Sequence, residues 1–318
     1  MKFDPSNKND VDLLVDTIDA QIEDASIEMF QNGHRDHLGA SLIGESCSRK
    51  LWYLFRWVKP ADFGSATRTQ GQVLRLFNRG HREEPAIIKL LEKSGHRFLP
   101  VAEGQDQHRI SLKCNGHFGG SLDAIGYLPE IFNFDDQVLY EFKTAGETQF
   151  RRLKKAGVKA DKPLHWAQMC VYGNDKNIRH ALYLCVNKNT DEIYIEFLVL
   201  DSNLAVTMEM KAEAIIEAEE PPAKIAMSAS HFVCKWCNFK DVCHYDEPVD
   251  VNCRSCKHSK PVENGQWKCK LADQVIPGDV VKLGCELHEG VQCLSQDHIN
   301  QKQLFLYLNT LISTQVIR

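Results

Sequence analysis

The sequence predicts an α/β protein in which helices flank a mixed central sheet, with a small cysteine-rich metal-binding region on the C-terminal side. The first observation is the order of the segments, in which helical spacing of apolar residues alternates with pairs of short apolar strands. The second is that eight of the twelve cysteines fall within residues 234–293, a stretch with too few apolar residues for a core of its own.

The first helix is expected at residues 11–30, where apolar residues at helical spacing are separated by carboxylates. The later helices are expected at residues 47–58, 67–95, around 164–173, and 201–220, and the strands at 119–128, 138–145, 180–188 and 192–200. Gly95 ends the third helix, because glycine is common just after a helix C-terminus. Asp201 and Ser202 provide the N-terminal cap of the last helix, and Pro221 stops it.

The composition, 43% hydrophobic and 25% charged, is typical of a water-soluble globular protein. No apolar run approaches the length that spans a bilayer, and the first residues do not read as an export signal. We therefore expect a cytoplasmic protein with no membrane contact. Cysteines crowded together in a reducing compartment favour metal ligands over disulfides.

The net charge of -5 argues against a uniformly basic nucleic-acid binder, but the charge is unevenly distributed. Residues 47–82 carry eight Lys and Arg against Asp62 alone, and residues 151–162 form a second basic run. The ordinary interpretation of such runs is a solvated helix face. Beside a carboxylate site they would also suit a polyanion, because phosphates need cations to balance them.

Two opposite charges lie on one face of the expected strand at 138–145. Successive side chains of a strand point to opposite faces, so Glu141 and Lys143 share the face of Leu139, while Tyr140 and Phe142 take the other. One interpretation is a simple ion pair between neighbours.

The other interpretation is a metal site. The preceding strand carries Asp123, and pairing of the two strands would bring it beside Glu141 and Lys143. Two carboxylates would hold a hard divalent cation, Mg²⁺ or Mn²⁺, through oxygen, and the lysine would orient a hydrolytic water.

This D…E-x-K arrangement resembles the PD-(D/E)xK nuclease superfamily. His81, directly after a glycine, resembles the metal-binding histidine of its RecB-type branch, and Gln168 and Tyr172 resemble the Q…Y helix of the same branch. A surface or core position is the competing interpretation for His81, and core packing is the competing one for Tyr172. The resemblance implies a restriction-endonuclease-like core.

The resemblance also implies the site residues. Its metal ligands would be His81, Asp123 and Glu141, and its catalytic residues Asp123, Glu141, Lys143 and Gln168. DNA would be the partner, and the residues expected to contact it are Arg49, Arg79, Arg151, Arg152 and Tyr172.

A first cysteine set follows the expected core. Cys234, Cys237 and Cys243 supply three thiolates, and the distant Cys47 is the candidate for the fourth. This order resembles the iron-sulfur nucleases of the RecB-type group, such as CRISPR adaptation nucleases and the B subunit of AddAB, over about residues 40–245. The resemblance implies a 4Fe-4S cluster, and zinc on the same ligands is the alternative.

A second cysteine set is consistent with a tetrahedral Zn²⁺ site. Its expected ligands are Cys253, Cys256, Cys269 and Cys285, and His258, His288 or Cys293 could replace one of them. We expect this region to bind zinc independently of the core, because its order should come from ligand bonds.

The predicted domains are an acidic N-terminal helical segment at 1–40, a nuclease core at 41–245, a zinc-binding module at 246–295 and a C-terminal helix at 296–318. The predicted function is a metal-dependent DNA exonuclease in the recombination or DNA processing of a phage or mobile element, acting in the bacterial host cytoplasm if phage-encoded. A recombinase or single-strand annealing protein is a candidate partner, and a homo-oligomer is a candidate assembly. The alternatives are a flap or junction endonuclease and a DNA-binding scaffold that does not cut.

Overall fold

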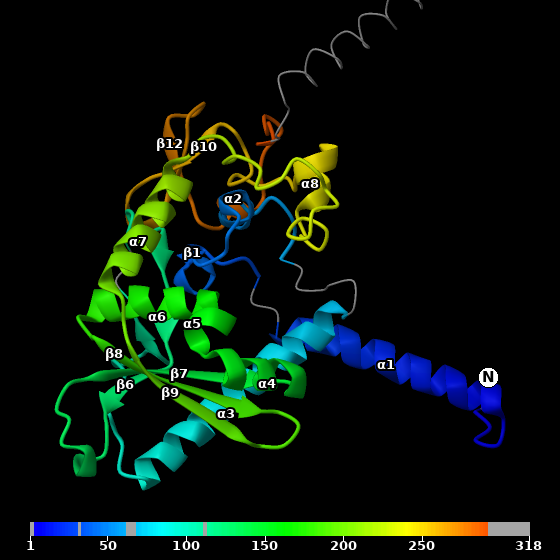
Figure 1. Cartoon of the computed structure of the whole chain (residues 1–318). Coiled ribbons are helices and arrows are strands. Elements are labelled where there is room, and N and C mark those ends of the chain that lie inside the picture. Colours follow the sequence, from blue (N-terminus) through cyan, green and yellow to red (C-terminus); the bar gives the residue numbers. More distant parts are fainter. Residues whose placement is uncertain (1–2, 31–32, 62–67, 111–112, 292–318) are drawn as a thin grey trace, which may run out of the picture.

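The computed structural model of the chain describes residues 3–30, 33–61, 68–110 and 113–291 (Figure 1). The C-terminal helix expected at 296–318 and the rival zinc ligand Cys293 lie outside the described residues. None of the described helices combines the length and apolar character needed to cross a membrane.

A five-stranded mixed sheet lies at the centre, in the order β2-β6-β7-β8-β9. Its strands are β2 (Arg97–Phe98), β6 (Ala124–Tyr127), β7 (Val138–Ala145), β8 (His180–Asn187) and β9 (Ile193–Val199). β7 and β8 are parallel, and the other three neighbouring pairs are antiparallel. The mixed central sheet predicted from the sequence is confirmed.

The strand expected at 119–128 is divided into short pieces. β4 (Phe118–Gly119) pairs in parallel with β1 (Leu38–Gly39), and β5 (Ser121–Leu122) pairs antiparallel with β3 (His108–Arg109), before β6 joins the main sheet. Gly120 lies at the break. A Cβ there would lie 2.5 Å from the hydroxyl oxygen of Tyr172, so only glycine allows this close approach.

Helices cover both faces of the sheet (Figure 1). On one face, Ile87 and Leu91 of α3 (Gln70–Lys93) form a cluster with Tyr140 and Phe142 of β7. On the other face, Leu139 belongs to a larger cluster that includes the buried residues of α6 (Pro163–Lys176). The predicted alternation of β7 side chains between two faces is therefore confirmed.

The remaining helices are α1 (Lys8–Phe30), α2 (Ser48–Phe55), α4 (Glu147–Ala156), α5 (Val158–Asp161), α7 (Ser202–Glu217) and α8 (Lys240–Tyr245), with 3₁₀ turns at Ala40–Leu42, Glu130–Phe132, Glu263–Gly265 and Val280–Lys282. The Asp201 carboxylate caps α7 by accepting from the backbone amides of Asn203 and Leu204, as the sequence predicts. α4 occupies the basic run, and its apolar residues Phe150 and Leu153 are buried.

The acidic helix α1 packs along α3. The carboxylate of Glu23 accepts a hydrogen bond from the Gly71 backbone amide at 2.6 Å and pairs with Arg75 at 3.3 Å. Its negative charge thus lies at the N-terminus of α3, where the helix dipole favours an anion.

The cysteine-rich region contains a three-stranded antiparallel ribbon of β10 (Ser259–Pro261), β11 (Trp267–Cys269) and β12 (Gln274–Ile276). Trp267 of this ribbon is 2% exposed, and its ring centroid lies 5.2 Å from that of Phe55 in α2. The guanidinium groups of Arg56 and Arg254 lie 5.1 and 4.7 Å from its ring centroid. Packing of the ribbon is therefore continuous with the main hydrophobic cluster.

Replacing Trp267 by alanine should lower the free energy of unfolding by about 3–5 kcal/mol, because a buried aromatic side chain and its cation–π partners are lost together. The measurement is urea unfolding followed by far-UV circular dichroism. Trp236→Ala is the matched control, because Trp236 is 69% exposed and its loss should cost no more than about 0.5 kcal/mol. Equal midpoints for the two variants would contradict this packing.

Candidate active site

Strand pairing brings Asp123, Glu141 and Lys143 together. Asp123 directly precedes β6, whose Ala124 lies opposite Tyr140 of β7. Oδ2 of Asp123 accepts a hydrogen bond from the Phe142 backbone amide at 2.7 Å and lies 3.6 Å from Nζ of Lys143. Nζ of Lys143 also pairs with Oε1 of Glu141. The arrangement expected from the sequence is present as a compact polar group.

Glu141 is the most buried member of this group, with a side chain that is 0% exposed. Its carboxylate accepts a hydrogen bond from the ammonium group of Lys143 within an ion pair. Burial, together with the charges of Asp123 and Glu84, raises the pKa of Glu141 to about 7, although Lys143 opposes the shift. Burial would lower the pKa of Lys143, but Asp123 and Glu141 more than offset it and raise that pKa.

Glu84 is a further carboxylate at this site that the sequence did not single out. Burial and then the charge of Asp123 raise the pKa of Glu84 to about 7, and Nε2 of Gln107 donates to its Oε2 at 3.3 Å. The available signal was helical spacing, because Glu84 follows His81 by three residues on α3. His81 itself is exposed, and the described residues show no contact between it and Asp123 or Glu141. Its assignment as a ligand stays a prediction.

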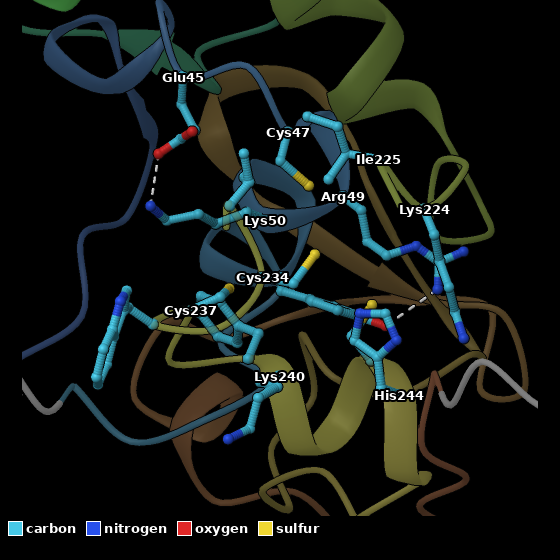
Figure 2. Close-up of a pocket in the computed structure, with 15 residues that line it drawn as sticks. Glu45, Cys47, Arg49, Lys50, Lys224, Ile225, Cys234, Cys237, Lys240 and His244 are labelled. Atoms are coloured by element: carbon cyan, nitrogen blue, oxygen red, sulfur yellow. Dashed lines mark hydrogen bonds and ion pairs between the residues drawn. The ribbon is translucent and has the colours of Figure 1, made fainter. Parts of the chain in front are cut away.

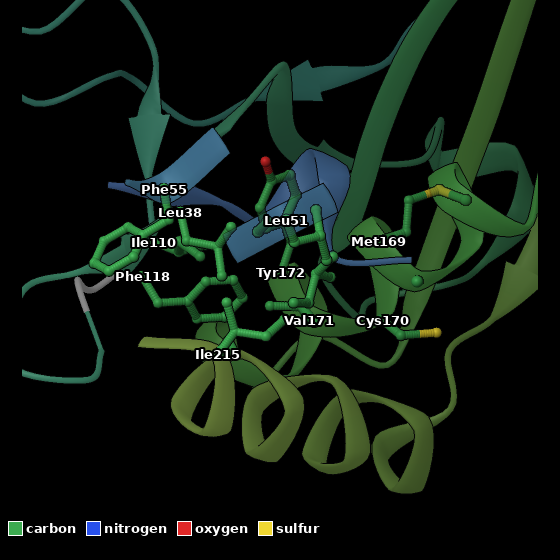
Figure 3. Close-up of a cluster of buried hydrophobic side chains, with 14 of the residues drawn as sticks. Leu38, Leu51, Phe55, Ile110, Phe118, Met169, Cys170, Val171, Tyr172 and Ile215 are labelled. Carbon is green, nitrogen blue, oxygen red and sulfur yellow. The ribbon is translucent and has the colours of Figure 1, made fainter. Parts of the chain in front are cut away.

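Gln168 and Tyr172 lie on the buried side of α6, at 6% and 1% exposure. Figure 3 shows Tyr172 among the apolar side chains of the main cluster. Burial and then the charges of Glu141 and Asp123 raise the pKa of Tyr172, and Gln168 hydrogen-bonds its side chain. Because Tyr172 is 1% exposed, it offers little surface to a bound strand, and its assignment as a DNA contact stays a prediction.

A histidine and a tyrosine extend the polar group on the same face. Tyr183 of β8 lies opposite Glu141 in the parallel register, and its hydroxyl lies 2.9 Å from Nδ1 of His165. Burial and then the charge of Lys143 lower the pKa of His165 to about 3. His165 is consequently neutral at physiological pH and adds no positive charge to the site.

Of the arginines expected to contact DNA, Arg49 differs from the expectation. It is buried, its Nε donates to the Pro222 carbonyl at 2.5 Å, and a second nitrogen donates to the Pro221 carbonyl at 3.4 Å. Arg49 thus fastens α2 to the segment after α7 and is not available to a phosphate.

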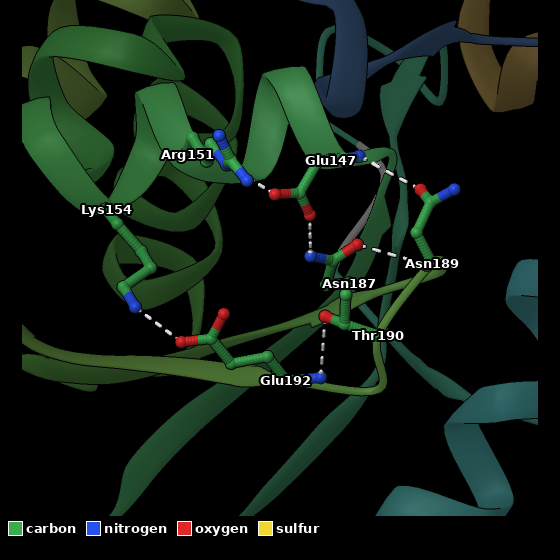
Figure 4. Close-up of polar contacts among 7 residues, drawn as sticks. All are labelled: Glu147, Arg151, Lys154, Asn187, Asn189, Thr190 and Glu192. Atoms are coloured by element: carbon green, nitrogen blue, oxygen red, sulfur yellow. Dashed lines mark hydrogen bonds and ion pairs between the residues drawn. The ribbon is translucent and has the colours of Figure 1, made fainter.

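Arg79, Arg151 and Arg152 have exposed side chains and stay predictions. Arg151 pairs with Glu147, which also accepts from Asn187 at the β8–β9 turn (Figure 4). These contacts hold the start of α4, which follows β7, against the end of β8.

A basic cavity of about 740 Å³ lies beside the end of β7. We call it the β7 cavity, and its described lining includes Arg68, Arg75, Arg79, Lys188 and residues 146–149. Burial, followed by the charges of Arg79 and Arg68, lowers the pKa of Lys188. Its first β7-side residue, Gly146, follows Lys143 by three positions in the chain.

The first cysteine set lines one cavity of about 250 Å³, the thiol cavity (Figure 2). Cys47 directly precedes α2, and the other three thiols come from the segment that ends in α8. Burial raises the pKa of Cys234, Cys237 and Cys243, and in each case the charge of Cys47 adds to the shift. The structure therefore brings Cys47 together with three thiols that follow it by almost 200 positions in the sequence.

The thiols of the second cysteine set also lie near one another, around Cys253. Burial and then the charges of three other thiols raise its pKa, and these belong to Cys285, Cys256 and Cys269. Both histidine rivals are engaged elsewhere. His258 pairs with Glu289 at 2.7 Å, and Nε2 of His288 lies 3.0 Å from Oγ of Ser255.

Within the described part of the chain, no three His, Cys, Asp or Glu side chains are arranged closely enough to hold a single metal ion.

No protein-family model matches the sequence, and a search of curated proteins finds no match. Among solved structures, the chain is similar to an alkaline exonuclease (LHK-Exo) from Laribacter hongkongensis, with a TM-score of 0.39 and 15% identity over 62% of this chain and 90% of that chain. LHK-Exo in complex with dAMP gives a TM-score of 0.38, 14% identity and the same coverage. SSO0001 gives a TM-score of 0.38 and 14% identity over 71% of this chain and 96% of that chain. TM-scores this low do not establish a shared fold, so the function is assigned from this chain's own side chains.

Without added divalent metal, Glu84→Gln should raise the melting temperature at pH 8 and leave it nearly unchanged at pH 5. The reason is the raised pKa, because the contribution of Glu84 to stability is present below its ordinary pKa of 4.5 and is lost as the pH rises through about 7. A neutral amide avoids that loss. The measurement is thermal unfolding by circular dichroism at both pH values. Glu83→Gln is the control, since Glu83 faces Arg79, and an equal effect of Glu84→Gln at both pH values would contradict the shift.

Proposed function

We propose that this chain is a divalent-metal-dependent deoxyribonuclease with a PD-(D/E)xK-type core. The observation that carries the proposal is the buried Glu141 carboxylate, which shares the ammonium group of Lys143 with Asp123. Two carboxylates beside one ammonium group leave excess negative charge, which Mg²⁺ or Mn²⁺ would balance through oxygen ligands.

Asp123 and Glu141 would hold the metal, Glu84 would complete the set from α3, and His81 is the further candidate ligand. When bound, the metal polarises a phosphate oxygen and lowers the pKa of a water molecule. Lys143 is cationic because its pKa is raised, so it donates to the water or the phosphate and does not act as a base. Gln168, buried on α6, would support the site through its hydrogen bond to Tyr172, which lies within the field of Glu141 and Asp123.

DNA is the proposed substrate because the β7 cavity gathers Arg68, Arg75, Arg79 and Lys188 at the end of the strand that carries Glu141 and Lys143. We propose hydrolysis from DNA ends, in recombination or DNA processing, since a compact chain with these motifs resembles the exonucleases of phage and mobile elements. A flap or junction endonuclease is the alternative within the enzymes. A scaffold that only binds DNA is disfavoured by the carboxylates, because Asp123, Glu141 and Glu84 would repel a phosphate backbone unless a cation lies between them.

We further propose a 4Fe-4S cluster on Cys47, Cys234, Cys237 and Cys243 and a zinc ion on Cys253, Cys256, Cys269 and Cys285. Support for the cluster comes from the shared thiol cavity, and support for zinc comes from the grouping around Cys253. Either centre would crosslink distant segments, and its effect would be structural.

Alanine at Asp123, Glu141 or Lys143 should lower cleavage of linear DNA by about 100-fold or more, because each residue holds the metal or the attacking water. The measurement is release of nucleotides from end-labelled linear DNA with Mn²⁺. Glu130→Ala is the control, since Glu130 is an exposed carboxylate on a 3₁₀ turn. Full activity in Glu141→Ala would remove the assignment. Covalently closed circles should be spared, and efficient cutting of circles would favour the endonuclease.

Protein purified without oxygen should be brown and contain iron and acid-labile sulfide, and Cys47→Ala should lose both, because Cys47 is the ligand that α2 contributes. The same sample should contain zinc, which Cys253→Ser should lose without loss of iron. Elemental and sulfide analysis provides the measurement, with Cys114→Ala as the control outside both sets. Zinc in place of iron at the first cysteine set would show that the alternative, zinc on the same four ligands, is right.

A further inference from the structure

A further cavity, larger than the β7 cavity and the thiol cavity, lies between α2, the start of α3 and the loop that carries Cys234 and Cys237. Its volume is about 890 Å³. We call it the α2 groove. It is outside the carboxylate site, and neither the catalytic residues nor the proposed metal centres account for its lining.

The charge of the α2 groove is of one sign. Its described lining includes Arg35, Lys50, Lys59 and Arg68, and contains no aspartate or glutamate. Lys50 pairs with Glu45, which lies outside the groove lining. Within the described part of the chain, no carboxylate forms an ion pair with Arg35, Lys59 or Arg68. These cations are therefore available to an anionic ligand.

The aromatic rings that line the groove differ in exposure. Trp57, Tyr53 and Phe239 are at most 5% exposed; Trp57 stacks on His34 with centroids 5.0 Å apart, and the centroids of Tyr53 and Phe239 are 5.5 Å apart. Trp236 also lines the groove and is 69% exposed, with Nζ of Lys235 5.0 Å from its ring centroid. A flat exposed ring beside a cation is suited to a base with its phosphate, because every base offers a π-face and every nucleotide a negative charge.

The groove leads towards the carboxylate site. Arg68 lines both the α2 groove and the β7 cavity, and the β7 cavity begins at Gly146, three residues after Lys143. Cations thus mark a path from Trp236, through Arg68, to the end of β7. The rings within this path meet only bases that are not paired, which favours a single strand over a duplex.

We infer that the α2 groove binds a single-stranded polynucleotide, with Trp236 as a stacking residue, and directs the strand towards β7. This inference deepens the proposed nuclease function and rests on it for the direction of the strand. The binding itself requires no cleavage and is testable without it.

The test uses the full chain without added divalent metal, so that no cutting occurs. Four of the five tryptophans, at positions 52, 57, 166 and 267, are at most 9% exposed, so a change in intrinsic fluorescence on ligand binding reports mainly on Trp236. Oligo(dT) should quench this fluorescence. In anisotropy titrations with labelled oligo(dT), Trp236→Ala should weaken binding about 5- to 150-fold, the range expected for one lost stacking contact.

Two matched variants accompany Trp236→Ala. Trp236→Phe keeps an aromatic face and should recover most of the affinity. Phe232→Ala removes a ring that is 79% exposed on the same segment but does not line the groove, and it should bind as tightly as the wild type. Equal losses in Trp236→Ala and Phe232→Ala would overturn the assignment.

Further ligands identify the source of the strand. Binding of oligo(dT) alone supports a DNA groove, and equal binding of oligo(U) supports recognition of single strands of either sugar. Blunt duplex or an acidic peptide that binds as tightly, with the same dependence on Trp236, would overturn the inference. If oligo(dT) binding depends on Trp236 but the wild-type chain cuts no DNA, the groove assignment stands and the nuclease assignment is refuted. If Trp236→Ala cuts DNA normally and binds oligo(dT) as tightly as the wild type, the groove assignment is refuted and the nuclease assignment stands.

Discussion

The short helix α2 is the element on which the arrangement of the whole chain depends. Five of its eight residues are buried, and Cys47, directly before it, faces the thiol cavity. Nε1 of Trp52 donates to the Ala218 carbonyl at 2.9 Å, and Arg49 donates to the two proline carbonyls that follow. These bonds join segments more than 160 positions apart, so they must offset a large loop-closure entropy. Burial of five of the eight α2 residues contributes to that offset.

Two buried arginines connect α2 to the cysteine-rich region, and burying them has an energetic cost. Burial lowers the pKa of Arg254 to about 9 and that of Arg56 to about 10. Arg56 donates to three backbone carbonyls of residues 254–259, and Arg254 lies 4.2 Å from the ring centroid of Trp57. Carbonyl dipoles and aromatic faces replace water around these charges. Trp267 and other apolar residues of the cysteine-rich region thereby pack with the main core, and zinc binding by this region independently of the core stays a prediction.

The features that were predictable from the sequence are those with a local cause. Alternation along β7 gave the correct faces of Glu141 and Lys143, and Asp201 gave the start of α7. Other features depend on contacts between distant segments. Arg49 resembled a solvated cation until the prolines that accept its hydrogen bonds were placed beside it, and Glu84 belongs to the site only because α3 crosses the sheet near Asp123. The sequence separation of these pairs leaves no local pattern to detect.

Buried charges are compensated differently around α2 and in the carboxylate site. Around α2, carbonyls and rings surround the buried cations, while Nε of Arg56 and Nε and Nη2 of Arg254 have no hydrogen-bond partner among the described residues. At β7, three carboxylates lie near Lys143, and burial, followed by the repulsion between the carboxylates, raises the pKa of both Glu84 and Glu141. One ammonium group does not balance three carboxylates at neutral pH. Balancing the excess negative charge of this region therefore requires protons or an added cation. A divalent ion placed there would relieve the repulsion between the carboxylates and provide the positive charge that a phosphodiester needs to approach.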